Sequence, residues 1–260
     1  WLRRQRQMCI RDRYYDDFSY ERNANMREFL QTNRPQKLLE QVKQKCILVL
    51  GWDGTMLRAI WDHHHENIPF LWVNFGHKGF LLNDYMWIEW EPREYESREY
   101  PLLDVSQNKQ RLWSAFNDVH IYSPEWKAIS LDMDIWVWNV SLWWDGVIIA
   151  TPAWSTWHSK SYHGPILPHK SENLVISPKW NIKTQTPKVI DNPSPISIKN
   201  TGRKFPFALN IDWVQQFISQ QDRDVEIEIY KSSRSVRLLI SSEHSRDWDN
   251  KVLAEQGFNS

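Results

Sequence analysis

Residues 46–55 read CILVLGWDGT, a short apolar run followed by a turn with two glycines and an aspartate. The run Cys46–Leu50 contains no polar residue, which is typical of a parallel strand that is buried on both faces. The turn Gly51–Thr55 leads into Met56–Ile60, which has the pattern of a helix start. Residues 69–75, PFLWVNF, are predicted to form the next strand. Strand, turn, helix and strand in this order predict a βαβ unit and an α/β fold for this part of the chain.

The turn after the first strand is suited to phosphate chemistry. A glycine-rich turn at this place lets backbone N–H groups approach phosphate oxygens. Asp53 in its middle can accept a proton from an attacking hydroxyl, or can help to hold a metal-bound phosphate. The alternative is an ordinary turn with a solvent-facing aspartate. The buried strand before the turn favours the functional interpretation.

Tryptophan is abundant where glycine is usual. The chain has 17 Trp and 8 Gly, whereas an average protein of this length has about 18 Gly. Trp143 and Trp144 precede Asp145-Gly146, and Trp213 follows Asp212 in a turn-like context. We hypothesise that a UGA codon read as glycine in the source has been translated as tryptophan. The alternative is a truly Trp-rich protein with indoles in tight turns, which favour residues that tolerate positive φ.

The bulk properties exclude several classes of protein. The 32 basic and 32 acidic residues balance, so neither a nucleic-acid partner nor a membrane partner is expected. Two cysteines make no disulfide framework, and a reducing cytoplasm is the expected location. Residues 1–13 are basic and lack the apolar core of a secretory signal. We expect them to be a non-native or disordered segment. If they are non-native, native sequence at the start of the first domain is expected to be missing, including an opening strand.

Short strands dominate the second half of the chain. We expect an α/β nucleotide-binding domain over 14–100, with a polar surface helix or connection at Trp87–Tyr100, a β-rich domain over 101–242 and a helical tail over 243–260. Alternation predicts a hairpin of Val225–Tyr230 with Ser235–Ser241. The other strands are expected at Ala128–Val137, Val147–Thr151, Glu172–Ser177, Pro195–Lys199 and Phe205–Ile211.

Two motifs together resemble a known family. With Trp52 and Trp154 read as glycine, residues 51–55 and 145–156 become GGDGT and DGVIIATPAGST. These stretches resemble the two signature motifs of the NAD kinases, which phosphorylate NAD to NADP. The resemblance implies an N-terminal Rossmann-like α/β domain followed by a C-terminal β-rich domain, in agreement with the segment pattern.

The same resemblance assigns the catalytic and nucleotide-binding residues. Asp53 corresponds to the general base that activates the 2′-hydroxyl of the adenosine ribose, which attacks the γ-phosphate of ATP bound to Mg²⁺ or another divalent cation. Phe80, in the stretch NFGHKGFLL, is placed to pack on the dinucleotide. The nucleotide-binding turn consists of Gly51, Trp52, Asp53, Gly54 and Thr55.

Further ligand contacts are implied in the second domain. Asn117 and Asp118 match the family's pair for a base edge and ribose hydroxyls, and Asp145 is expected near the nicotinamide end. Thr156 and Ser159 are expected near adenine. The remaining two positions depart mildly from the family, which has Ala and Tyr where this chain has Trp157 and His158. Histidine can still stack on the ligand or donate a hydrogen bond to it.

Several assignments remain open at this point. The family is generally oligomeric, so the resemblance implies a homodimer or homotetramer. A lipid kinase of the diacylglycerol or sphingosine type shares the GGDGT loop, and an inactive dinucleotide-binding protein is a second alternative. His63–Glu66 does not have the spacing of a zinc helix, so we expect no protein metal site there.

The codon hypothesis predicts glycine at position 52 of the native protein. Mass spectrometry of peptides from the source organism is expected to give the glycine mass there, and an indole mass would contradict the hypothesis. If the chain folds with tryptophan at positions 52 and 154, we expect both indoles to be displaced into a cleft or to solvent. The reason is that an inserted bulky group costs about 1–3 kcal/mol in a packed site.

Overall fold

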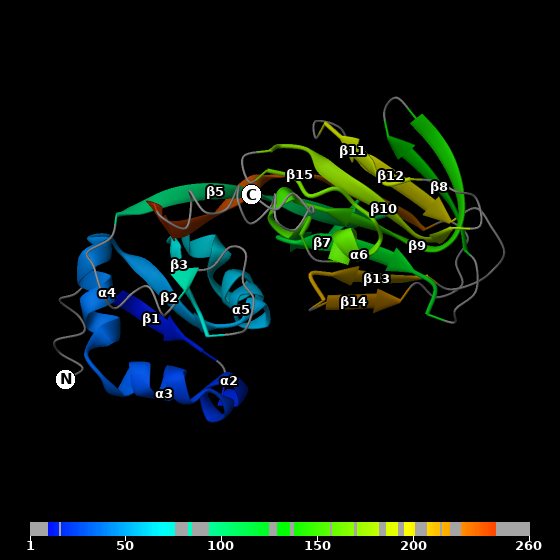
Figure 1. The fold of residues 1–260 in the computed structure, drawn as a ribbon. Helices are drawn as coiled ribbons and strands as arrows, with labels where there is room; N and C mark the ends of the chain where they lie inside the picture. Colours follow the sequence, from blue (N-terminus) through cyan, green and yellow to red (C-terminus); the bar gives the residue numbers. More distant parts are fainter. Residues whose placement is uncertain are drawn as a thin grey trace, which may run out of the picture. The chain divides into compact units, whose positions relative to one another are not determined.

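The fold was analysed in a computed structural model of the full chain. It describes residues 10–15, 17–75, 83–84, 94–124, 129–135, 138–156, 158–168, 171–181, 186–191, 195–200, 207–213, 215–218 and 225–242. The chain divides into two compact units. Unit 1 consists of Trp1–Tyr100 and Ser235–Ser260, and unit 2 consists of Pro101–Arg234. Figure 1 shows the helices of unit 1 in blue and cyan and the strands of unit 2 in green to orange.

Unit 1 contains a parallel sheet in the order β1, β2, β3 and β15. Strand β2 (Cys46–Gly51) is buried along its whole length, and it pairs in parallel with β3 (Phe70–Asn74). The short strand β4 (Asn83–Asp84) also pairs with β3. The predicted βαβ unit is therefore present, because α5 (Asp53–His63) connects β2 to β3.

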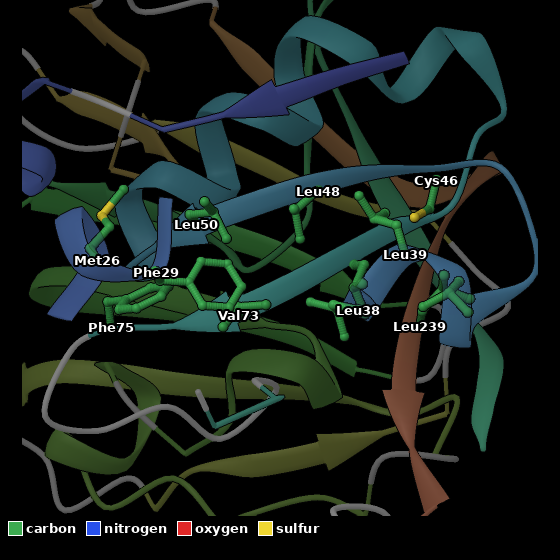
Figure 2. Close-up of a cluster of buried hydrophobic side chains, with 12 residues drawn as sticks. Met26, Phe29, Leu38, Leu39, Cys46, Leu48, Leu50, Val73, Phe75 and Leu239 are labelled. Atoms are coloured by element: carbon green, nitrogen blue, oxygen red, sulfur yellow. The ribbon is translucent and has the colours of Figure 1, made fainter. Parts of the chain in front are cut away.

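The sheet of unit 1 is covered by helices because β2 carries apolar side chains on both faces. One face packs against α3 (Ala24–Gln31) and α4 (Arg34–Val42). In Figure 2 Phe29 and Leu38 of these helices lie against Leu48 and Leu50 of β2. Ile47 and Val49 alternate with these residues and point to the opposite face, which faces α5. The remaining helical elements are α2 (Asp17–Arg22) and the short 3₁₀ helix η1 (His64–Glu66).

The start of unit 1 differs from the expectation of a disordered segment. Residues Ile10–Tyr14 form strand β1, which pairs in parallel with β2, with Tyr14 opposite Val49. The pairing satisfies backbone groups along the otherwise open edge of β2, which is the physical reason for a strand here. Residues 1–9 lie outside the described residues.

Unit 2 is built almost wholly from antiparallel strands. Its main sheet has the order β15, β12, β8, β9, β7, β13 and β14, with β10 on β9, β11 on β10, and β5 on β6. The bounds are β5 (Tyr95–Gln107), β6 (Gln110–Ala115), β7 (Asp118–Tyr122), β8 (Ile129–Ile135), β9 (Trp138–Ala150), β10 (Leu174–Asn181), β11 (Lys188–Ile190), β12 (Ile196–Asn200), β13 (Ala208–Ile211), β14 (Gln215–Ile218) and β15 (Glu226–Ser241). The only helical elements among its described residues are η3 (Pro152–Trp154) and α6 (His158–Ser161).

The predicted hairpin at the end of unit 2 is wrong. Glu226–Ser241 is one continuous strand, β15, whose first part pairs with β12 and whose later residues Leu238 and Leu239 pair with β3. The intervening residues 231–234, KSSR, contain no glycine, asparagine or aspartate. A tight hairpin needs such residues for positive φ, so the chain continues extended.

Two other expectations concern the connection and the tail. Residues 95–100, expected in a surface helix or connection, are the first part of β5. The remainder of that stretch up to residue 93, and the expected tail 243–260, lie outside the described residues. Among the helices that the structure describes, none has the length and apolar character needed to cross a membrane.

Candidate functional site

Three segments that are distant in sequence meet at the start of β7. Strand β7 lies between β9 and β13, and Asp118 is opposite Ala150 while Val119 is opposite Ile211. Both neighbours run antiparallel to β7, so their last residues lie beside its first. The register therefore brings residues 116–118 next to the segment after Ala150 and next to Asp212.

Asn117 and Asp118 are buried with free hydrogen-bonding capacity. Asn117 is 1% exposed and Asp118 is 0% exposed. Among the residues that the structure describes, the amide of Asn117 has no hydrogen-bond partner. The carboxylate of Asp118 accepts no hydrogen bond of normal geometry, although the His158 ring lies 3.5 Å from it. An unpaired buried polar group costs about 1–3 kcal/mol, so such groups in a folded protein call for an explanation. A ligand that supplies donors and acceptors would satisfy both side chains.

Several aromatic rings cluster beside Asp118. The ring of His158 lies with its Nδ1 3.5 Å from Asp118 Oδ2. Its centroid is 5.0 Å from that of His120 and 4.7 Å from that of Trp213. His120 in turn stacks on Tyr122 at 4.6 Å. Flat rings beside unpaired polar atoms are the components that recognise a heterocyclic base.

Burial shifts the pKa values of two ionisable side chains in this site. Burial raises the pKa of Asp118, and the neighbouring imidazole of His158 opposes that rise. For His120, burial together with the charges of His158 and Lys179 lowers the pKa to about 2. His120 is therefore neutral at physiological pH and can accept or donate a hydrogen bond through its ring.

The segment after β9 contains Ser155, Thr156 and Ser159, which are all buried. Thr156 is 7% exposed. The hydroxyl of Ser159 is hydrogen-bonded to that of Ser177 at 2.8 Å, and the hydroxyl of Ser155 accepts from Leu167 N at 2.9 Å. Ser155 therefore fixes the path of the following loop, and Ser159 already has one partner inside the protein.

Asp145 lies on the same strand but away from the pair. It is five residues before Ala150, which at the rise of an extended strand is about 16 Å. Its neighbourhood includes Lys179, because Lys179 is opposite Gly146. Burial lowers the pKa of Lys179, while the charge of Asp145 raises it. The structure thus does not bring Asp145 together with Asn117 and Asp118, although all three lie in unit 2.

In unit 1 the turn Gly51–Thr55 joins β2 to α5. Gly51 has φ +146°, and a Cβ there would lie 2.6 Å from Thr55 Oγ1, so glycine is required. Thr55 N and Met56 N donate to Trp52 O, which begins the helix. The amides of Asp53 and Gly54 precede these donors in the first turn, where the helix dipole favours an anion.

Asp53 has the electrostatics of a base. Burial raises its pKa from 3.8 to about 6. A carboxyl with a pKa near the working pH is a more effective proton acceptor than an exposed aspartate. Within the described ranges no group of three or more His, Cys, Asp or Glu is placed to hold a metal ion. His63 Nδ1 instead contacts Glu66 Oε1 at 2.9 Å.

The tryptophans at expected glycine positions behave differently from one another. Trp52 is 44% exposed, as expected for a displaced indole. Trp154 is only 9% exposed, so the expectation was wrong for this residue: the 3₁₀ turn η3 places its ring among buried neighbours. Trp213 is 55% exposed and has φ +58°. Positive φ is a rare and unfavourable conformation for a bulky residue.

Some residues of the site were not predicted from the sequence, and two of the predicted residues cannot be located in the structure. Phe80 and Trp157 lie outside the described residues. Asp212 and His120 contribute to the site, but no motif had assigned them a role, and Thr151 lies in the second motif without having been assigned one. A sign was present for His120, since it stands on a strand directly after the Asn-Asp pair and two residues from Asp118.

The comparisons with known proteins identify related chains. The family model described as "ATP-NAD kinase N-terminal domain" matches residues 7–85. The NAD kinase of Xylella fastidiosa (strain Temecula1) is 30% identical over 230 residues, which cover 84% of this chain and 85% of that protein. The NAD kinase of Brucella suis is 34% identical over 224 residues, 81% of this chain and 84% of that protein.

Solved structures share the fold. An NAD kinase from Archaeoglobus fulgidus, in complex with ATP, has a TM-score of 0.67 at 21% identity and covers 94% of this chain and 97% of its own. Yeast NADH kinase complexed with NADH has a TM-score of 0.65 at 22% identity, covering 83% of this chain and 66% of its own. Both support the arrangement of an α/β part followed by a β-rich part.

The backbone at position 213 predicts a measurable preference for glycine. Trp213→Gly and Trp213→Ala both remove the indole, but only alanine keeps a Cβ at positive φ. We expect the glycine variant to be more stable than the alanine variant by about 1 kcal/mol, measured by denaturant unfolding. Position 52 is the control, because Trp52 has φ −106°. At position 52 the glycine variant should be no more stable than the alanine variant. An equal stability difference between the two variants at both positions would contradict the role of positive φ at Trp213.

Proposed function

This chain belongs to the NAD kinase family, and we propose that it transfers the γ-phosphate of ATP to the 2′-hydroxyl of the adenosine ribose of NAD to give NADP. The observation that supports this most directly is the buried pair Asn117 and Asp118, whose side chains have unused hydrogen-bonding capacity among the described residues. An amide and a carboxylate are the groups that read a base edge and ribose hydroxyls. Their places in the chain match the family's motif.

The reaction requires a base and neutralisation of phosphate charge. Asp53 would accept the proton of the 2′-hydroxyl as the oxygen attacks phosphorus, and its raised pKa fits that role. The first-turn amides of α5 would face phosphate oxygens. Mg²⁺ or another divalent cation would arrive with ATP as the substrate complex and supply the charge neutralisation typical of phosphoryl transfer. The carboxylate of Asp53 would be one oxygen ligand that a phosphate-bound cation could approach.

The second unit would hold NAD. Asn117 and Asp118 would contact a base and a ribose, with Thr156, Ser159 and His158 on the adenine side and Asp145 toward the nicotinamide. Phe80 and Trp157 keep the roles that the family motif implies. The separation of Asp145 from Asn117 and Asp118 along β9 is in keeping with a ligand that is bound in an extended form.

The lipid kinase alternative has no support in the comparisons. None of the relatives named above is a lipid kinase. A lipid kinase would also have no use for a buried Asn-Asp pair beside stacked aromatic rings.

NADP formation is the direct test. We expect the Trp52→Gly, Trp154→Gly variant to form NADP from ATP, Mg²⁺ and NAD, and the literal chain to be less active, because Trp52 stands beside the proposed base. The coupled assay should be repeated with polyphosphate, NADH and diacylglycerol as alternative substrates. No NADP under any donor would contradict the proposal, and equal activity of both forms would remove the functional support for the codon hypothesis.

Asp53→Asn tests the base. The change keeps the shape of the side chain but removes the proton acceptor, so we expect kcat to fall by about 10²–10⁴-fold with a much smaller change in NAD affinity. The base works in its ionised form. Activity of the parent should therefore rise with pH and level off above a pKa of about 6. Below it, kcat/KM should fall about tenfold per pH unit. A variant within a few fold of the parent would exclude Asp53 as the base.

The assembly and location are part of the same proposal. We infer a homodimer or homotetramer in the cytoplasm, with no nucleic-acid or membrane partner. Light scattering of the full chain is expected to give at least twice the mass of one chain, and a monomer at micromolar concentration would contradict the oligomer.

A further inference from the structure

A buried carboxylate holds the backbone of the Asn117–Asp118 segment from a distant part of the chain. Asp212 is 0% exposed. Its Oδ2 accepts a hydrogen bond from Phe116 N at 2.7 Å. Its Oδ1 accepts from Asn117 N at 2.7 Å and from Asp118 N at 3.1 Å. Three successive amides thus converge on one side chain, an arrangement of N–H groups that proteins otherwise use to bind anions.

The carbonyls of the same segment are also satisfied. Thr151 Oγ1 donates to Phe116 O at 2.8 Å, and Thr151 N donates to Asn117 O at 2.8 Å. Asp212 N donates to Asp118 O at 3.0 Å. All six backbone polar groups of residues 116–118 therefore have partners in Asp212 and Thr151. The side chains of Asn117 and Asp118 are not needed to hold their own backbone.

Burial opposes the ionisation of Asp212, and the backbone amides favour it. Burial is the largest effect and raises the pKa of Asp212 to about 7; the N–H of Phe116 opposes the rise, and the charge of Asp118 adds to it. Two buried carboxylates lie close together, and the three amides are what makes the position of Asp212 tenable.

We propose that Asp212 is a positioning residue for dinucleotide binding, which acts by fixing the backbone of residues 116–118 so that Asn117 and Asp118 face the ligand. The inference rests on the proposed function, since it takes NAD as the ligand of that pair. Asp212 does not touch the reacting atoms, so its loss should weaken NAD binding without changing the chemical step. The function of the three-amide contact is preorganisation: the ligand finds its partners already oriented.

Asp212→Asn is the variant of choice. It keeps the shape of the side chain but replaces one accepting oxygen by an NH₂ group, which cannot accept from an amide. In the full-length, glycine-restored chain we expect the KM for NAD to rise about tenfold or more. The kcat and the KM for ATP should stay within about threefold. A KM for NAD within twofold of the parent would overturn the proposal.

Asp104→Asn is the matched control. Asp104 is another buried carboxylate of unit 2 and accepts hydrogen bonds from Ser232 Oγ at 2.8 Å and Arg234 Nη2 at 2.7 Å. The same chemical change there should lower the melting temperature but leave the KM for NAD unchanged. An equal rise in that KM for both variants would show a general loss of stability and would overturn the positioning role.

A double variant tests the route of the effect. If Asp212 acts through Asn117, then Asp212→Asn combined with Asn117→Ala should raise the KM for NAD by less than the product of the two single effects. A full product would mean independent action and would count against the proposal. Asn117→Ala alone with an unchanged KM would contradict the proposed function itself. An effect at Asn117 with none at Asp212 would contradict only the present inference.

The contact can also be measured in the parent protein, should Asp212→Asn fail to fold. Amide protons donated to a carboxylate at 2.7 Å are expected to resonate well downfield and to exchange slowly with deuterium. The amides of Phe116 and Asn117 should show both properties in NMR spectra. Ordinary shifts and fast exchange at both would overturn the proposal.

Discussion

The register of β7 is the constraint on which the site in unit 2 depends. Because β7 pairs with β9 on one side and β13 on the other, the first residues of β7 lie beside the last residues of β9 and β13. A shift of one residue in either ladder would turn every side chain of that strand to the opposite face. The buried pair Asn117 and Asp118, the carboxylate of Asp212 and the loop after Ala150 would then no longer meet.

The two units carry groups that suit nucleotide chemistry of different kinds. In unit 1 the turn at Gly51 and the start of α5 present amides and one largely buried carboxyl, which suits phosphate and proton transfer. In unit 2 the groups at Asn117 and Asp118 are side chains with free donors and acceptors beside aromatic rings, which suits bases and sugars. A kinase that acts on a dinucleotide needs both kinds of recognition.

The local features of the fold could be predicted from the sequence, and the distant contacts could not. Strand β2, its glycine turn and α5 follow from neighbouring residues, and so does the Asn-Asp pair. The contact of Asp212 with residues 116–118 joins positions more than 90 residues apart. Only the ladder between β7 and β13 creates it, and the turn-like sequence around Asp212 gives no sign of it. The continuity of β15 was missed for a similar reason, since its two ends pair with different strands.

The buried polar atoms of Asn117, Asp118 and His120 that form no hydrogen bond among the described residues also make the stability of the protein depend on a ligand. In the free protein these buried groups lower the free energy of unfolding, and a bound ligand that pairs them restores it. Whatever binds the native state alone stabilises it in proportion to the logarithm of its concentration. If that ligand is the dinucleotide substrate, the resistance of the chain to proteolysis would rise with the concentration of the substrate.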